Sequence, residues 1–172
     1  HGIPDDYAIQ PGDLVKLDVT AELDGYMADA AITVAVPPVA PRHRDLCRCT
    51  EAALRRAVRQ ARAGAPIRAI GRAVEREARR HRLTIIPELT GHGIGRVIHE
   101  DPDIPNYYDP FDNRRLTEGL VITIEPLICS GSGEIYEDSD GWTVRTQDGS
   151  PAAHFEHTLV VTKGKPLLLT AA

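Results

Sequence analysis

The sequence is poor in cysteine and has no long apolar run, and both absences narrow what the chain can be. Only three of its 172 residues are cysteines: Cys47, Cys49 and Cys129. An odd, small number of cysteines is typical of a reduced cytosolic protein rather than of a disulfide scaffold. No run approaches the roughly 20 apolar residues that a membrane-spanning helix needs, and no signal peptide is visible. We therefore expect a cytoplasmic protein without a membrane partner.

Positive charge is also in short supply, since 20 Lys and Arg residues face 25 Asp and Glu residues and give a formal net charge of −5. Proteins that bind nucleic acids usually present a basic face, so we expect no nucleic-acid partner. The arginines are concentrated in stretches of helical periodicity, where we interpret them as solvated helix surface. The hydrophobic fraction of 42% is typical of a globular protein, and the length suits a single domain over 1–172.

The spacing of apolar residues predicts a hairpin followed by two helices. Alternation over 14–20 and 26–36, on either side of the turn dipeptide Asp24-Gly25, predicts an antiparallel β-hairpin. Apolar residues at helical spacing predict one helix over 45–63 and a second over 66–81, with a proline in its first turn. Further strands are predicted over 83–89, 120–125, 142–145, 155–162 and 166–170. The order of the elements indicates an α/β fold of the α+β kind.

Two stretches are predicted to be irregular. Residues 91–95 contain three glycines around His92, which we interpret as too many for a regular strand. Residues 101–113 are polar and contain three prolines, which is typical of a loop. Neither stretch carries the Lys-Ser/Thr of a phosphate-binding loop, and no HExxH zinc helix follows His99-Glu100.

The hairpin places two aspartates near each other. A two-residue loop sets Asp29 opposite Thr20, and Thr20 shares a strand face with Asp18. The two aspartates are then diagonal neighbours, roughly 7–8 Å apart at the backbone. Taken alone, this pattern favours two solvent-exposed strand carboxylates. A cation between them would relieve their repulsion.

Three further residues could bind a metal. His92 lies between glycines, which let the backbone approach a ligand closely. Glu125 ends an apolar strand, and Glu156 precedes another, so a buried position would require each carboxylate to have a partner. Each glutamate alone is equally consistent with an edge-strand carboxylate. Together with Asp18 and Asp29, these residues could hold a pair of divalent ions such as Co, Mn, Fe or Zn.

The other cysteines and histidines show no ligand pattern. Cys47 and Cys49 lie in the first predicted helix without a second cysteine pair, so we interpret them as buried or half-buried thiols. His157 follows Glu156 directly and is expected on the opposite strand face. We interpret three more histidines as structural or surface residues: His43, His81 and His154.

Taken together, the motifs resemble one family, the type I methionine aminopeptidases of the M24 metallopeptidases. The matching segments are His1-Gly2-Ile3-Pro4-Asp5-Asp6, Asp18-Val19-Thr20 with Asp29, Thr90-Gly91-His92-Gly93-Ile94-Gly95-Arg96, His99-Glu100-Asp101-Pro102, Thr123-Ile124-Glu125-Pro126, Asp140-Gly141-Trp142-Thr143-Val144 and Phe155-Glu156-His157-Thr158. The resemblance covers nearly the whole chain. It implies the "pita-bread" fold, in which helices cover a curved antiparallel sheet.

The resemblance also implies an activity, the hydrolytic removal of N-terminal methionine from nascent proteins and peptides. Two divalent metal ions would be bound by five residues, with Asp29 and Glu156 bridging: Asp18, Asp29, His92, Glu125 and Glu156. Glu125 would move the proton, and His99 would stabilise the tetrahedral intermediate. His1, a further catalytic residue by this resemblance, would lie near the scissile amide, and both His1 and His99 would contact the substrate. Ile98 and Trp142 would line part of the methionine pocket.

The sequence departs from the family pattern in four places, one of which is the loop over 101–113 with Tyr107-Tyr108 and additional acidic residues. Ala30 replaces the threonine usual after the second aspartate, and Ile98 stands where phenylalanine is common. The family fold also has a further region before the motif that begins at His1, so we expect that N-terminal segment to be missing and to act as a possible partner. These departures leave the five expected ligands unchanged.

Three alternatives to a methionine aminopeptidase stay open from the sequence. The first is an X-Pro aminopeptidase or prolidase with the same fold. The second is a pita-bread binding module without catalysis. The third is a processed fragment that completes its fold with another polypeptide. A substrate panel, a metal analysis and an intact-mass measurement distinguish them from one another.

Overall fold

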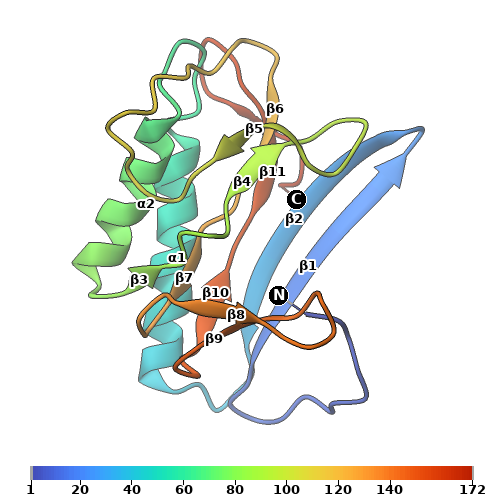
Figure 1. Cartoon of the computed structure of the whole chain (residues 1–172), viewed down its shortest axis with the longest axis vertical. Helices are drawn as coiled ribbons and strands as arrows, with labels where there is room; N and C mark the ends of the chain where they lie inside the picture. The colour runs from blue at the N-terminus through green and yellow to red at the C-terminus, as the bar shows by residue number, and fades with distance from the viewer. Residues whose placement is uncertain (1, 172) are drawn as a thin grey trace.

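The computed structural model describes residues 2–171 and places two helices on one side of curved antiparallel strands (Figure 1). The helices are α1 (Pro41–Val58) and α2 (Arg68–Arg80). The strands are β1 (Leu14–Leu23), β2 (Tyr26–Ala35), β3 (Thr84–Ile85), β4 (Gly91–Gly93), β5 (Glu100–Ile104), β6 (Val121–Ile124), β7 (Leu127–Cys129), β8 (Ile135–Glu137), β9 (Val144–Thr146), β10 (Ala152–His154), β11 (His157–Val160) and β12 (Leu167–Leu168). This arrangement confirms the predicted α+β layout.

The first two strands form the predicted hairpin in the predicted register. Thr20 pairs with Asp29, and Asp18 pairs with Ala31. Asp24 and Gly25 both have positive φ angles, 54° and 78°, as a tight two-residue hairpin turn requires. Both strands are long and reach well beyond the rest of the sheet (Figure 1).

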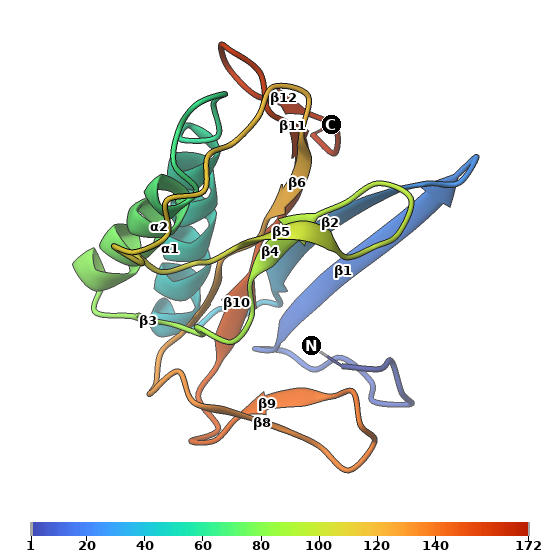
Figure 2. The ribbon, with the colours of Figure 1, turned by 45° about the horizontal axis from the view of Figure 1, so that its top comes forward.

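The central sheet has five strands in the order β12-β11-β6-β4-β5. Alternation along β6 separates its two faces, because Ile122 and Ile124 join the core beneath the helices while Thr123 and Glu125 point the other way. Figure 2 shows the β1–β2 hairpin on the side of this sheet that lies away from α1 and α2. The face of β6 that carries Thr123 and Glu125 therefore looks toward the hairpin.

The core lies between the helices and the strands. In α1 the buried residues recur at helical spacing and include Cys49, which is fully buried, while Cys47 is partly buried. The prediction that Cys47 and Cys49 are buried or half-buried thiols is confirmed. The α1 helix begins earlier than predicted, because Pro41 occupies its first turn, where a missing N–H costs nothing. Neither helix combines the length and apolar character needed to cross a membrane in the described part of the chain.

Two segments differ from their predicted structure. Residues 91–95 were expected to be irregular, but Gly91–Gly93 forms β4 and pairs with both β5 and β6. The loop expected over 101–113 is wrong at its start, because Glu100–Ile104 forms β5. Pairing with neighbouring strands stabilises these segments despite their poor β-propensity. Three short strands were not predicted: β7, β8 and β10.

Charge is segregated between the helical region and the rest of the chain. Residues 41–82, which contain both helices, hold 13 of the 17 arginines and only four acidic residues, a formal charge of +9. All other residues together carry −14, which leaves the net charge of −5. The four candidate ligand carboxylates all belong to the negative part.

Candidate metal centre

Strands from distant parts of the sequence bring acidic and imidazole side chains together on the sheet face that looks toward the hairpin. Asp29 lies on β2 and His92 at the middle of β4, whereas Glu125 follows β6 and Glu156 lies between β10 and β11. One ligand atom from each of Asp29, His92 and Glu156 lies within 4.8 Å of the other two. These three side chains are close enough to coordinate a common ion.

The hairpin is fastened to the central sheet at the candidate site. The Thr158 hydroxyl accepts a hydrogen bond from the Asp29 backbone N–H at 2.9 Å and donates one to the Asp29 carbonyl at 2.8 Å. The Glu156 backbone N–H donates to the Ala31 carbonyl at 2.8 Å. These bonds hold β2 along β11, and they fix the two carboxylates expected to bridge the metals beside each other.

The orientation of His92 leaves one ring nitrogen available to a metal. Its Nδ1 lies 2.8 Å from the Gly93 carbonyl oxygen, which can only accept, so Nδ1 carries the proton. The lone pair is then on Nε2, which lies 3.3 Å from Glu125 Oε1. The Thr123 hydroxyl accepts from the His92 backbone N–H at 3.0 Å and donates to Glu125 Oε1 at 2.8 Å. This arrangement has the orienting hydrogen bond that metal-binding histidines usually have.

The glycines on either side of His92 serve strand packing. A Cβ at Gly91 would lie 2.7 Å from the Thr123 carbonyl oxygen, and one at Gly93 would lie 2.2 Å from that of Asp101. Both contacts are too short for a side chain. The close backbone approach inferred from the sequence is therefore made to the neighbouring strands β6 and β5.

The acidic side chains are buried in a way that fits bound cations. Asp29 Oδ1 and Glu156 Oε1 are buried and have no hydrogen-bond partner among the described residues. Burial raises the pKa of Glu125 to about 7, against the lowering effect of the Thr123 hydrogen bond and of His92. Burial, reinforced by Glu125 and the nearby aspartates, raises the pKa of Glu156 to about 10. Divalent ions would remove this repulsion and would satisfy the unpaired oxygens.

Asp18 and His154 complete the cluster. Asp18 lies on β1, diagonal to Asp29 as predicted, and its side chain is 35% exposed. Asp18 Oδ2 lies 3.6 Å from Nδ1 of His154, a residue that is only 4% exposed. The interpretation of His154 as a structural or surface residue missed this position. One signal was available, because His154 precedes Glu156 by two residues and so shares its strand face.

Comparison with known proteins identifies the family to which this cluster belongs. The model of metallopeptidase family M24 matches residues 1–163. The chain belongs to this family. Methionine aminopeptidase 2 of Bacillus subtilis (strain 168) is 46% identical over 172 residues, which are 99% of this chain and 69% of that protein. Methionine aminopeptidase of Treponema pallidum (strain Nichols) is 45% identical over 99% of this chain and 67% of that protein.

Solved structures place this M24 chain with the same group. Methionine aminopeptidase from Rickettsia prowazekii superimposes with a TM-score of 0.95 and 39% sequence identity over 99% of this chain and 69% of that one. Prolidase from Pyrococcus furiosus superimposes with a TM-score of 0.80 and 27% identity over 100% of this chain and 45% of that one. The pita-bread fold and the resemblance to methionine aminopeptidases are thus confirmed. The M24 chain spans about two thirds of the length of the methionine aminopeptidases.

Among the other predicted site residues of the M24 chain, His99 contacts the cluster directly. The His99 ring meets the His92 ring edge to face, with centroids 4.4 Å apart. Ile98, which directly precedes His99 in the sequence, is partly buried. Trp142 lies in the connection between β8 and β9 and is 54% exposed. His1 lies outside the described residues.

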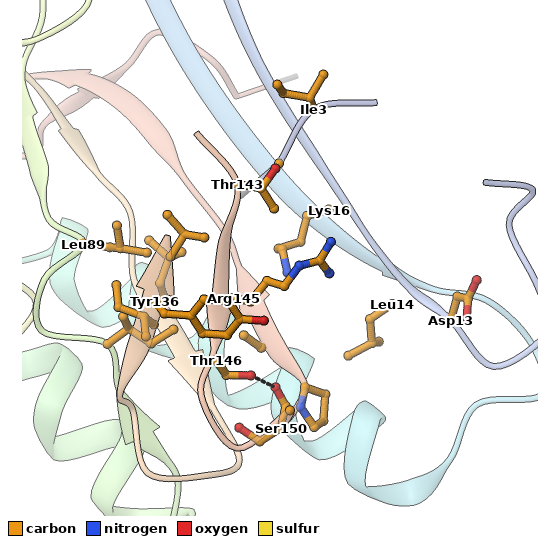
Figure 3. Close-up of a pocket in the computed structure, with 18 of the residues that line it drawn as sticks. Ile3, Asp13, Leu14, Lys16, Leu89, Tyr136, Thr143, Arg145, Thr146 and Ser150 are labelled. Atoms are coloured by element: carbon orange, nitrogen blue, oxygen red, sulfur yellow. Dashed lines mark hydrogen bonds between the residues drawn. The ribbon is translucent and has the colours of Figure 1, made fainter. Parts of the chain in front are cut away.

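A cavity of about 1000 Å³ lies between the N-terminal segment, the first strand and the β8–β9 hairpin (Figure 3). Its lining includes Ile3, Lys16, Tyr136 and Arg145. None of the five expected ligands lines it, and neither do the expected pocket residues Ile98 and Trp142. The buried cluster and this cavity are therefore separate features of the described structure.

Proposed function

We propose that the chain is a methionyl aminopeptidase, which removes the N-terminal methionine from nascent proteins and peptides by metal-dependent hydrolysis. The observation that carries this proposal is the 46% identity with Methionine aminopeptidase 2 of Bacillus subtilis over 99% of this chain. Three of the five residues that the resemblance assigns to the metals, Asp29, His92 and Glu156, gather in one buried cluster, which supports the proposal.

Five side chains would hold two divalent ions of Co, Mn, Fe or Zn: Asp18, Asp29, His92, Glu125 and Glu156. Asp29 and Glu156 would bridge, which agrees with their adjacent positions and their unpaired buried oxygens. When bound, the ions supply Lewis-acid activation of the scissile carbonyl and of the attacking water. The donor set of four carboxylates and one imidazole suits these ions.

The remaining roles belong to side chains around the cluster. Glu125 would accept a proton at its carboxylate and return it to the leaving amine, since its pKa of about 7 lies near neutrality. His99 would donate a hydrogen bond where negative charge develops on the substrate oxygen, which agrees with its contact with His92. His1, Ile98 and Trp142 would contact the substrate.

The test combines metal analysis with turnover of a Met-Ala-Ser peptide, before and after treatment with EDTA and after addition of Co or Mn. We expect two metals per chain and release of free methionine, both lost after chelation and restored by metal. Turnover that persists without metal would contradict the proposal, and metal-loaded protein without turnover would favour the binding module.

An X-Pro peptidase is the alternative that the shared fold with the Pyrococcus furiosus prolidase favours. An Ala-Pro dipeptide and an Ala-Pro-Ala tripeptide, assayed beside Met-Ala-Ser, separate the two activities. Faster cleavage of the proline peptides would reassign the substrate.

We also propose that residues 1–172 act as one catalytic domain in the cytoplasm. One hydrophobic cluster includes residues of both helices and of the central sheet, which supports a single domain. The three cysteines are free thiols, which suits a reducing compartment.

A further inference from the structure

His99 lies in the loop that joins β4 to β5. This loop spans residues 94–99, and His99, its last residue, is exposed although its ring contacts that of His92. Loops are more mobile than the elements they connect. The role given to His99 in the proposed function requires its ring to stay where charge develops on the substrate. The loop itself must therefore be held in place.

Glu100, the first residue of β5, fastens this loop from the inside. Its Oε1 accepts a hydrogen bond from the backbone N–H of Arg96 at 2.7 Å and a second from that of Val97 at 3.1 Å. The side chain thus reaches back across its own loop. Because hydrogen bonds to a carboxylate are roughly twice as strong as those between neutral groups, this pair is a firm local constraint.

Gly95 shows how closely the loop surrounds the carboxylate. A Cβ at this position would lie 3.0 Å from both carboxylate oxygens of Glu100, which is closer than ordinary van der Waals contact. The backbone N–H of Gly95 also donates to the Val97 carbonyl at 3.3 Å. The start of the loop is therefore wrapped around the Glu100 side chain.

The outer side of the loop is fastened to the β1–β2 hairpin, over which the loop extends in Figure 2. The Met27 backbone N–H donates to the Gly95 carbonyl at 2.8 Å. The Arg96 guanidinium stacks on the Tyr26 ring, 3.9 Å from its centroid, and donates to the Tyr26 hydroxyl at 2.9 Å. The hairpin thus holds residues 95 and 96 from outside, and Glu100 holds residues 96 and 97 from inside.

The part of the loop expected at the substrate lies between two fixed points. One is the hydrogen bond from Val97 to Glu100, and the other is the pairing of Glu100 with Gly93 across β5 and β4. Ile98 and His99 are the two residues between these points. So short a segment leaves the His99 ring little freedom to move away from the candidate metal centre.

We propose that Glu100 is a positioning residue, which holds His99 at the candidate metal centre by tying residues 96 and 97 to the start of β5. This inference rests on the role of His99 in the proposed function. Glu100 acts through the loop and not on the substrate or the metals. Its removal should therefore release His99 while the expected metal ligands stay where they are.

NMR of the metal-free protein in EDTA measures the position of His99 without any turnover. The ring centroids of His92 and His99 are 4.4 Å apart, so we expect a nuclear Overhauser effect between their ring protons. Glu100→Ala should weaken this effect severalfold, whereas Glu100→Gln, which keeps an oxygen acceptor, should retain most of it. Glu118→Gln, a change of an exposed carboxylate, is the matched control and should leave it unaltered. An undiminished effect in folded Glu100→Ala would overturn the proposal.

Kinetics of Met-Ala-Ser hydrolysis separate positioning from general stabilisation. Glu100→Ala should lower kcat about 100-fold, the cost of a misplacement of about 1 Å, while KM and the metal content stay as in the native protein. Glu100→Gln should recover a large part of the loss. In a His99→Ala background Glu100→Ala should have little further effect, because the group that it positions is absent. Equal losses in both backgrounds would indicate a purely structural role and would contradict the proposal.

This inference and the proposed function fail in different ways. A native protein without turnover would refute the proposed function, whereas a nuclear Overhauser effect that depends on Glu100 would still support the positioning of His99. If Glu100→Ala does not fold, Glu100→Asp decides the matter, because its carboxylate is one methylene group shorter and cannot reach both N–H groups. An undiminished nuclear Overhauser effect and full kcat in Glu100→Asp would overturn the proposal.

Discussion

The buried glutamates make the metal-free protein sensitive to pH. Burial, as the main cause, raises the pKa of Glu125 to about 7 and that of Glu156 to about 10. In an unfolded chain both would titrate near 4.3. Between these values the folded protein binds more protons than the unfolded protein, so the free energy of unfolding falls as the pH rises. A bound cation removes this cost by stabilising both carboxylates in their ionised form.

The metal-free protein should therefore melt at a lower temperature at pH 8.5 than at pH 6, and Glu156→Gln should flatten much of that dependence. Glutamine has no ionisable group, so the variant avoids the loss of folding stability that ionisation of the buried Glu156 causes at the higher pH. Thermal denaturation in EDTA, followed by circular dichroism, measures the effect. An unchanged slope in the variant would contradict burial of Glu156 as the cause, and added Co should raise the melting temperature only of the native protein.

Removal of a bridging carboxylate should abolish metal binding. Asp29→Ala and Glu156→Ala are each expected to lose metal binding and to reduce turnover of Met-Ala-Ser at least about 100-fold, because even outer partners of metal ligands are worth about 10–100-fold. Metal analysis and peptide assays provide the measurements. Glu118→Gln, a change of an exposed carboxylate, should retain both properties. Two metals and full turnover in either alanine variant would contradict the ligand assignment.

Among individual residues, the positions of the aspartates were predicted from the sequence more accurately than those of the histidines. The turn dipeptide fixed the register of β1 and β2, so the relation of Asp18 to Asp29 followed from the spacing alone. The position of His154 depends on β10, a three-residue strand that pairs with β7. In the sequence, β8 and β9 separate these two strands. Its short length gave no periodicity from which the strand could be predicted.

Among the elements, β4 shows how packing can decide a structure against local propensity. Glycine is unfavourable in strands, yet Gly91 and Gly93 lie where neighbouring backbones leave no room for a side chain. Pairing with β5 and β6 requires this closeness, and it places His92 in the buried cluster. Non-local pairing of this kind cannot be deduced from the composition of the segment.

Gly93→Ala should therefore disturb both stability and metal binding. The new methyl group would meet the Asp101 carbonyl oxygen at 2.2 Å, and the strands must separate to accommodate it. We expect a loss of about 1–3 kcal/mol in the free energy of unfolding, as for other overpacked sites, with weaker metal binding as His92 moves. Urea denaturation and metal titration measure the two effects.

Gly164→Ala is the matched control for this change. A Cβ at Gly164 would have its nearest neighbour at 4.0 Å, so the variant should be nearly as stable as the native protein and should bind metal equally well. Equal stability of Gly93→Ala and Gly164→Ala would contradict the packing argument.

The longer elements were predicted more accurately than the short ones. Helical spacing predicted both α1 and α2, whose stripes of buried residues contribute eight of the 18 buried residues of one core cluster. The strand expected over 83–89 is reduced to the two residues of β3. Strands of two or three residues are stabilised by their partners in the sheet, which a local pattern does not contain.

For the molecule as a whole, the outer face of the hairpin is unusually apolar. Leu17, Val19, Ile32 and Val34 are each 43–61% exposed, and they lie on the face opposite to Asp18 and Asp29. A contiguous apolar surface of this kind favours association.

We expect the 172-residue chain to self-associate through this face. Val19→Lys should return it to a monomer, because a charge in the middle of the face cannot be buried cheaply. Sedimentation velocity over a range of concentrations measures the change. Leu167→Lys, a similar substitution at an exposed position of β12, should leave the association unaffected. A monomer in the unmodified chain would contradict the expectation.

The segregation of charge makes the molecule an electric dipole whose negative end contains the candidate metal centre. A peptide carries a positive ammonium group at its N-terminus, so the field draws it toward the strands and repels it from the helices. Hydrolysis of one peptide bond leaves a shortened peptide with a new ammonium group of the same charge. The field that speeds the arrival of the substrate therefore also delays the departure of this product, and salt weakens both effects together.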